Sequence, residues 1–129
     1  MKTLVFLTLF TLSYMAPAFS NDIYEEITKA IQSGDSKKVS SYFGSSIDIT
    51  LLNEEAIYSK VQGEQILKDF FLKNPPKTFH LLHKGSSKES ILYGIGKLET
   101  KDGKKFRISF FMKNNAGNYT IQELRCEVE

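Results

Sequence analysis

The chain has 129 residues, of which 17 are basic and 15 acidic, so its formal net charge at pH 7 is only +2. Charges of both signs are mixed along the sequence, which argues against nucleic acid as a partner and against a basic patch for a membrane surface. Aromatic residues make up 12% of the chain, which is enough for a packed core and argues against intrinsic disorder.

The first part of the chain has the pattern of a secretory signal peptide. One lysine precedes an apolar run over residues 4–15, and small residues then allow cleavage after Ala18 or Ser20. This run is shorter than the ~20 residues that a membrane-spanning helix needs. We therefore predict an exported protein, periplasmic or secreted, in which residues 1–20 are removed and residues 21–129 form one domain with no membrane span.

Two helices are predicted at the start of the mature chain. Residues 22–33 carry apolar side chains at helical spacing, Asp22 can cap the N-terminal end, and Gly34 suits the C-terminal end. A second, shorter helix is expected from Asp35 to Phe43. Each helix has one apolar face, so both are expected to pack against a core.

A pair of strands and a third helix follow. Residues 47–52 and 56–60 are expected to form two short strands joined by a turn. Gly63 is expected to break the second strand. The apolar stripe that comes next predicts a helix that starts at Glu64 and stops at Asn74, because two prolines follow.

From Thr78 onward the apolar period changes to two, which predicts antiparallel strands. Four strands are expected, at about residues 78–85, 89–100, 104–113 and 118–128. The dipeptide Asp102-Gly103 between two of them is a strong hairpin signal. In the last strand the apolar phase slips between Ile121 and Leu124, which predicts a β-bulge near Gln122.

The single cysteine, Cys126, lies on this last strand. One cysteine cannot form an internal disulfide, so packing alone is expected to stabilise the exported domain. We favour a buried apolar role for Cys126. The alternative is an intermolecular disulfide or a reactive thiol.

The order of the elements and several local patterns resemble the nuclear transport factor 2-like superfamily, a group of cystatin-like folds. The patterns are the Gly34-Asp35 step between two helices, the Gly63 entry into the third helix and the closing aromatic-rich strands. The resemblance covers nearly all of residues 22–128. It implies an α+β fold, in which a strongly curved, mainly antiparallel sheet forms a cone packed against three helices from the N-terminal half.

A narrower resemblance is to an exported bacterial branch of this superfamily that has no assigned function. Residues 83–87, 93–96 and 121–125 carry it. The superfamily contains isomerases, dehydratases, binding modules and transport adaptors, and its members often form homodimers. The fold therefore does not give the function.

Enzymes of this superfamily usually place a carboxylate base, or an Asp–His pair, inside the cone. Asp48 is the candidate base here, but it alternates with Ile47 and Ile49, so we favour a solvent-facing position.

His80 and His83 stand three apart on one expected strand and should point to opposite faces, so no metal site is predicted. His83 is expected to share a face with Phe79 and Leu81, either inside the cone or on a dimer-forming sheet surface.

Four side chains can present a hydrogen-bond donor to a ligand from a strand. These predicted ligand-binding residues are Tyr58, His83, Tyr93 and Arg107. The glycines at 94 and 96 are expected to let the sheet curl, because a glycine within a strand often marks a bend or a close approach. No catalytic residue, metal ligand or cofactor is predicted.

Three functions stay open, in the following order. The first is a non-enzymatic module that holds a small apolar ligand or a peptide in the cone. The second is a homodimeric structural or interaction protein that uses the outer face of its sheet. The third is an isomerase or dehydratase with Asp48 or His83 as the base. The first would be contradicted by a cone filled with the rings of Phe70, Phe71, Phe106 and Phe110.

Overall fold

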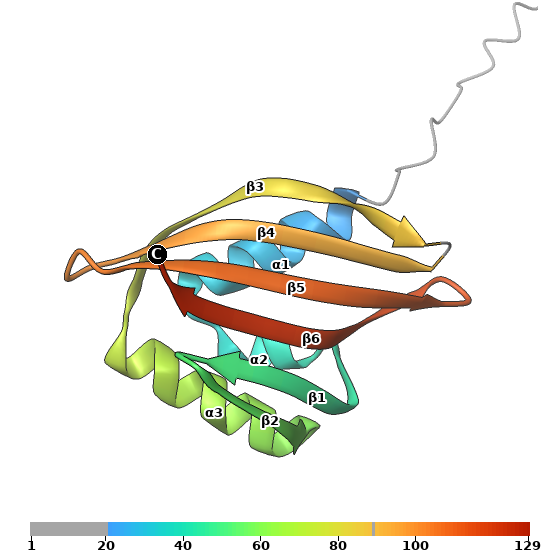
Figure 1. Ribbon diagram of the computed structural model, residues 1–129, viewed down its shortest axis with the longest axis horizontal. Helices are drawn as coiled ribbons and strands as arrows, with labels where there is room; N and C mark the ends of the chain where they lie inside the picture. Colours follow the sequence, from blue (N-terminus) through green and yellow to red (C-terminus); the bar gives the residue numbers. More distant parts are fainter. Residues whose placement is uncertain (1–20, 89) are drawn as a thin grey trace, which may run out of the picture.

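The computed structural model describes residues 21–88 and 90–129, so the predicted signal peptide lies outside the described residues. In this part of the chain, three helices pack against one sheet of six strands (Figure 1). The helices are α1 (Asn21–Ser33), α2 (Ser36–Ser40) and α3 (Lys60–Lys73). The side chain of Asp22, the predicted cap of the first helix, also lies outside this description. None of the described helices is long and apolar enough to cross a membrane.

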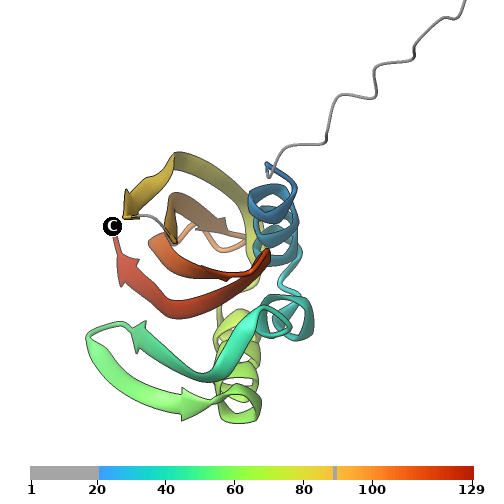
Figure 2. The ribbon, with the colours of Figure 1, turned by 90° about the vertical axis from the view of Figure 1, so that its right-hand side faces the viewer.

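The strands form a strongly curved sheet in the order β2-β1-β6-β5-β4-β3. They are β1 (Phe43–Leu51), β2 (Glu54–Ser59), β3 (Pro76–Lys88), β4 (Ile91–Thr100), β5 (Lys105–Asn115) and β6 (Asn118–Val128). All neighbours are antiparallel except β1 and β6, which run parallel. Figure 2 shows the sheet bending around the core, with the helices along its concave side. This arrangement confirms the predicted α+β cone with three helices.

The apolar core fills the space between the concave face of the sheet and the helices. Fully buried side chains come from all parts of the fold, among them Ile27 of α1, Ile47 of β1 and Phe79 of β3. In β5, alternate residues face the core, as a strand with one buried face requires. They are Phe106, Ile108, Phe110 and Met112.

Gly94 and Gly96 of β4 make room for two of the core rings. A Cβ at Gly94 would lie 2.4 Å from the Cζ of Phe110, and one at Gly96 would lie 2.4 Å from the Cζ of Phe79. Real Cβ atoms do not approach other atoms so closely. The two glycines therefore allow the rings to pack directly on the backbone of the curved strand.

The first two helices and the strand that follows them differ in part from expectation. α1 confirms the predicted helix, and Gly34 ends it with a positive φ of 68°. Asp35 caps α2 by accepting a hydrogen bond from the Lys38 N–H at 3.0 Å. The predicted extension of this helix to Phe43 is wrong. Phe43 instead begins β1, where it pairs with Ile121 of β6 and buries its ring in the core.

Gly63 does not break a strand but lies inside α3. The helix starts earlier than predicted, because Ser59 and Gln62 form a reciprocal capping box at its N-terminus. Gly63 is buried against β1, and a Cβ there would lie 2.7 Å from the Cγ2 of Ile47. The glycine allows α3 to approach β1 closely.

Two of the register shifts between neighbouring strands bear on the predictions. The predicted bulge in β6 is confirmed: Phe111 pairs with Glu123 while Met112 pairs with Ile121, which leaves Gln122 between them. A second bulge, which was not predicted, lies at Leu82 of β3, where the register with β4 shifts. It reverses which side chains of β3 face the core from His83 to Ser86, and a further register shift follows before Lys88.

Candidate functional site

The interior of the cone is filled by aromatic side chains. Four rings would leave no room for an interior ligand if they filled the cone: Phe70, Phe71, Phe106 and Phe110. None of them is more than 5% exposed, and the ring centroids of Phe70 and Phe106 lie 5.3 Å apart. The buried polar residues in the described part of the chain are Ser36, Ser40, Asn74 and Thr100, with no acid or histidine among them. Among the described residues, the core therefore offers no buried acid or histidine that could act as a catalytic base.

The convex face of the sheet holds three of the four predicted ligand-binding residues. Tyr93 alternates with the buried Gly94 and pairs with Phe111, whose ring centroid lies 6.4 Å from its own. His83 and Arg107 line one shallow hollow of about 260 Å³, together with Lys97 of β4. The fourth predicted residue, Tyr58, lies apart from them on β2, in a groove of about 380 Å³ beside α3.

The bulge at Leu82 explains why two predictions about the histidines are wrong. Phe79 is buried and Leu81 packs against the core, but His83 is exposed on the convex side. His80 is exposed as well, so the two histidines share the convex side instead of pointing to opposite faces. In the described residues, no group of three or more potential ligands from His, Cys, Asp and Glu could hold a metal ion.

An apolar strip runs along the convex face. It consists of Ile91, Tyr93 and Ile95 of β4 and Phe111 of β5, all of them half-buried. Ion pairs flank it, with Arg125 Nε 2.5 Å from a Glu123 oxygen and Lys97 Nζ 3.4 Å from a Glu129 oxygen. The helices lie on the other side of the sheet, so this strip has no cover from them (Figure 2).

Asp48 also lies on the convex side, on β1, away from the buried Ile47 and Ile49 as expected. Its Oδ1 atom and the Oγ1 atom of Thr50 are buried, and neither has a hydrogen-bond partner. Its neighbours across the two adjacent strands are Ile57 and Glu123. Asp48 therefore does not face the interior, where a superfamily base is expected.

Cys126 is a buried free thiol on the concave side of β6. Burial, with a smaller contribution from the nearby Glu127 carboxylate, raises the pKa of the Cys126 thiol to about 12. The reactive thiolate is therefore scarce at neutral pH. This position agrees with the favoured interpretation of Cys126 as a small apolar core residue.

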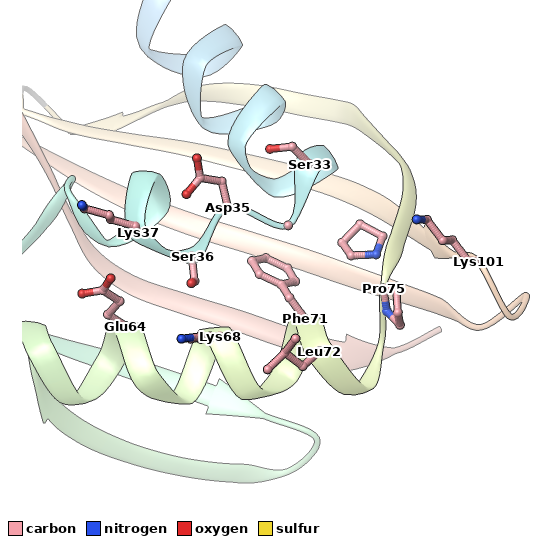
Figure 3. A pocket seen from close by; sticks show the side chains of 12 residues that line it. Ser33, Asp35, Ser36, Lys37, Glu64, Lys68, Phe71, Leu72, Pro75 and Lys101 are labelled. Atoms are coloured by element: carbon pink, nitrogen blue, oxygen red, sulfur yellow. The ribbon is translucent and has the colours of Figure 1, made fainter.

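Sequence reasoning missed a cleft of about 450 Å³ (Figure 3). It lies between the α1–α2 turn, α3 and the start of β3, and we name it the α2–α3 cleft. Its apolar residues are Phe71, Leu72, Pro75 and Pro76. Its basic residues are Lys37, Lys68 and Lys101, which Figure 3 shows spread from α2 to the β4–β5 turn.

Local backbone contacts build the walls of the α2–α3 cleft. Gly34 forms the sharp turn between α1 and α2, with its Cα facing the ring of Pro76. The N–H of Lys101 donates to the carbonyl of Pro75 at 2.9 Å, which fixes the β4–β5 turn to the segment after α3. No local motif marks this site, because its residues come from three separate stretches of the sequence, 33–37, 64–76 and 101.

Comparisons with known proteins agree with this fold. Residues 24–127 match the family described as a domain of unknown function (DUF4783). The crystal structure of a DUF4783 family protein from Bacteroides ovatus has a TM-score of 0.75 at 25% identity, covering 81% of this chain and 93% of that chain. One from Bacteroides fragilis has a TM-score of 0.74 at 26% identity, covering 81% and 96%.

A more distant likeness supports the predicted fold. A nuclear transport factor 2-like protein of unknown function from Shewanella baltica has a TM-score of 0.62 at 12% identity, covering 84% of this chain and 90% of that chain. At this identity the likeness concerns the fold alone. A search among curated proteins found no match to the chain.

Proposed function

The chain belongs to the DUF4783 family of domains of unknown function, and from this premise we propose that it is a non-enzymatic interaction domain that forms a homodimer through the convex face of its sheet. The observation that carries the proposal is the apolar strip, which is half-buried and lies opposite the helices. Contiguous apolar surface of this kind is typical of protein interaction sites. Tyr93 and Phe111 supply aromatic anchors, which are enriched in the centres of interfaces.

The charges around the strip favour a second copy as the occupant. Arg107 and Lys113 of β5 are basic, and Glu127 of β6 and Asp48 of β1 are acidic. The single arginine of β6 is paired with Glu123, so the net charge of the face still changes from basic on β5 to acidic on β6 and β1 along the strand order. A twofold axis parallel to the strands would bring the basic side of one protomer over the acidic side of its partner.

The filled core argues for this function over the two alternatives. A small apolar ligand in the cone would have to displace buried rings such as Phe110, and displaced core packing is costly. An isomerase or dehydratase needs a base beside an enclosed substrate. The two candidate bases, Asp48 and His83, lie on the convex side and not in the core.

We further propose that the domain acts after export, in a periplasm or outside the cell. This proposal rests on the apolar run and the small residues within positions 1–20. Expression of the full chain in a bacterial host tests it. A secreted product whose N-terminus is residue 19 or residue 21 is expected, and retention of Met1 on a cytoplasmic product would contradict it.

Light scattering on residues 21–129 tests the dimer. A dimer is expected at about 100 μM protein, which is well above a dissociation constant of about 1 μM. Ile95→Lys, which puts a charge in the apolar strip, is expected to give a folded monomer. The matched control is Val61→Lys, which places the same charge on an exposed apolar residue of α3 and should leave the dimer intact. A monomeric parent protein, or equal effects of both variants, would overturn the proposal.

A further inference from the structure

We propose that the α2–α3 cleft binds an acidic peptide segment that also carries apolar side chains. The cleft is built from the helices and the start of β3, whereas the proposed dimer uses the opposite, convex side of the sheet. The two proposals are therefore independent. Each can fail without the other.

The apolar contribution comes from one stripe of α3. Leu72 and Val61 are 70% and 69% exposed, although both are large apolar side chains. Residues eleven apart on an α-helix are separated by only about 20° around the axis and about 16 Å along it. Leu72 lines the cleft, and Val61 continues the same stripe toward the start of α3. An extended segment of about five residues spans that length.

The charge of the cleft selects an acidic partner. Lys68 lies on the same stripe between the two apolar residues, and Lys37 and Lys101 stand at the two ends of the cleft (Figure 3). Among the described residues, these three lysines form no ion pair, whereas Lys29 and Lys73 are each paired with an acid one helical turn away. Carboxylates of a bound segment would supply the missing partners.

The two acids of the cleft do not cancel this preference. Asp35 is already engaged, because its carboxylate accepts the Lys38 N–H at 3.0 Å as the cap of α2. Glu64 lies at the α2 end of the cleft and can accept a backbone N–H of a bound peptide. The lining thus carries three lysines against two carboxylates, which leaves a net charge of +1 beside its apolar side chains.

The test uses residues 21–129 and three labelled peptides with acetylated N-termini and amidated C-termini. The first is Leu-Glu-Glu-Glu-Leu, the second replaces each Glu by Gln, and the third replaces each Glu by Lys. Fluorescence anisotropy should give a dissociation constant below about 1 mM for the acidic peptide and binding at least about tenfold weaker for the other two. Backbone amide shifts in an NMR titration should change at α2, α3 and the β4–β5 turn.

Matched variants separate the cleft from general surface effects. Lys68→Glu is expected to weaken binding of the acidic peptide at least about tenfold. Lys105→Glu, which changes an exposed lysine of β5 outside the cleft lining, is expected to leave binding unchanged. Leu72→Ser is expected to weaken binding about fivefold, whereas Val128→Ser, which changes an equally exposed residue of β6, should not. Lack of amide shifts at α3 up to about 1 mM peptide would overturn the proposal. The proposal would also be overturned if each cleft variant and its control lost the same affinity for the peptide. Binding to phosphatidylglycerol vesicles without binding to the peptide would overturn it as well.

Discussion

The ring of Phe110 lies directly on the backbone of Gly94, its cross-strand partner in β4. A Cβ at position 94 would stand 2.4 Å from the Cζ of that ring. Phe110 is fully buried, so its ring has no open space into which it could move. Because Gly94 has no side chain, the ring of Phe110 can occupy the space above its backbone on the concave face.

Gly94→Ala is therefore expected to destabilise the domain, although alanine suits a strand no worse than glycine does. Overpacking of a tight core costs about 1–3 kcal/mol, and such a loss lowers Tm by roughly 4–20 °C for a domain of this size. Thermal and urea unfolding followed by circular dichroism measure the change. Gly44→Ala is the control, because a Cβ there meets nothing closer than 3.5 Å. Equal stability of the two variants would show that the ring moves aside.

Thr50→Val is expected to stabilise the domain or leave it unchanged, within about 1 kcal/mol. The Oγ1 atom of Thr50 is buried on the convex side of β1 and has no hydrogen-bond partner. Valine has nearly the same shape and removes the unpaired hydroxyl. Urea unfolding of the variant and the parent measures the difference. A loss of more than about 1 kcal/mol would mean that the hydroxyl is bonded in solution, for example to an ordered water.

Features that depend on local periodicity could be predicted from the sequence. The long strands follow from alternation, and the bulge at Gln122 follows from the phase slip between Ile121 and Leu124. The bulge at Leu82 has no such signal in the sequence. Leu81 and Leu82 are both apolar, so the alternation of apolar and polar residues does not show which of them faces the core. Gly63 was misread for another reason. Its role depends on its distance to Ile47, a residue of another element that no local pattern relates to it.

The surface sites were less predictable than the fold. Polar residues on strands could be named in advance, but the bulge in β3 decided that His83 joins Arg107 on the convex face. The α2–α3 cleft could not be inferred at all. Lys37, Lys68 and Lys101 are far apart in sequence and each resembles an ordinary solvated lysine until the fold brings them to one cleft.

Cys126 is expected to react slowly with the thiol reagent DTNB in the folded protein and fast in denaturant. Burial raises the pKa of its thiol to about 12, so the reactive thiolate is rare at pH 7 and the sulfur is also shielded from the reagent. Absorbance at 412 nm follows the labelling with and without 6 M guanidinium chloride. Equal rates in the two conditions would contradict the buried position and revive the alternative of a reactive thiol.

The last prediction concerns alkaline pH and the contact between Tyr42 and Glu26. Tyr42 lies between α2 and β1, and its hydroxyl donates a hydrogen bond to the Glu26 carboxylate of α1. Burial, followed by this bond and the charge of Glu26, raises the pKa of Tyr42 from its ordinary value of 10 to about 12. The folded state therefore holds the phenol proton more tightly than the unfolded state does.

Linkage then sets the direction of the pH effect. The stability that the neutral phenol contributes is complete below pH 10 and is lost as the pH rises from 10 to 12. Tyr42→Phe removes this titration, so the urea midpoint of the variant should fall less over that range than the midpoint of the parent. At pH 7 the variant should be less stable by about 0.5–1.5 kcal/mol, the usual worth of one hydrogen bond. Parallel midpoint curves for both proteins from pH 9 to pH 12 would show that Tyr42 titrates alike in the folded and unfolded states.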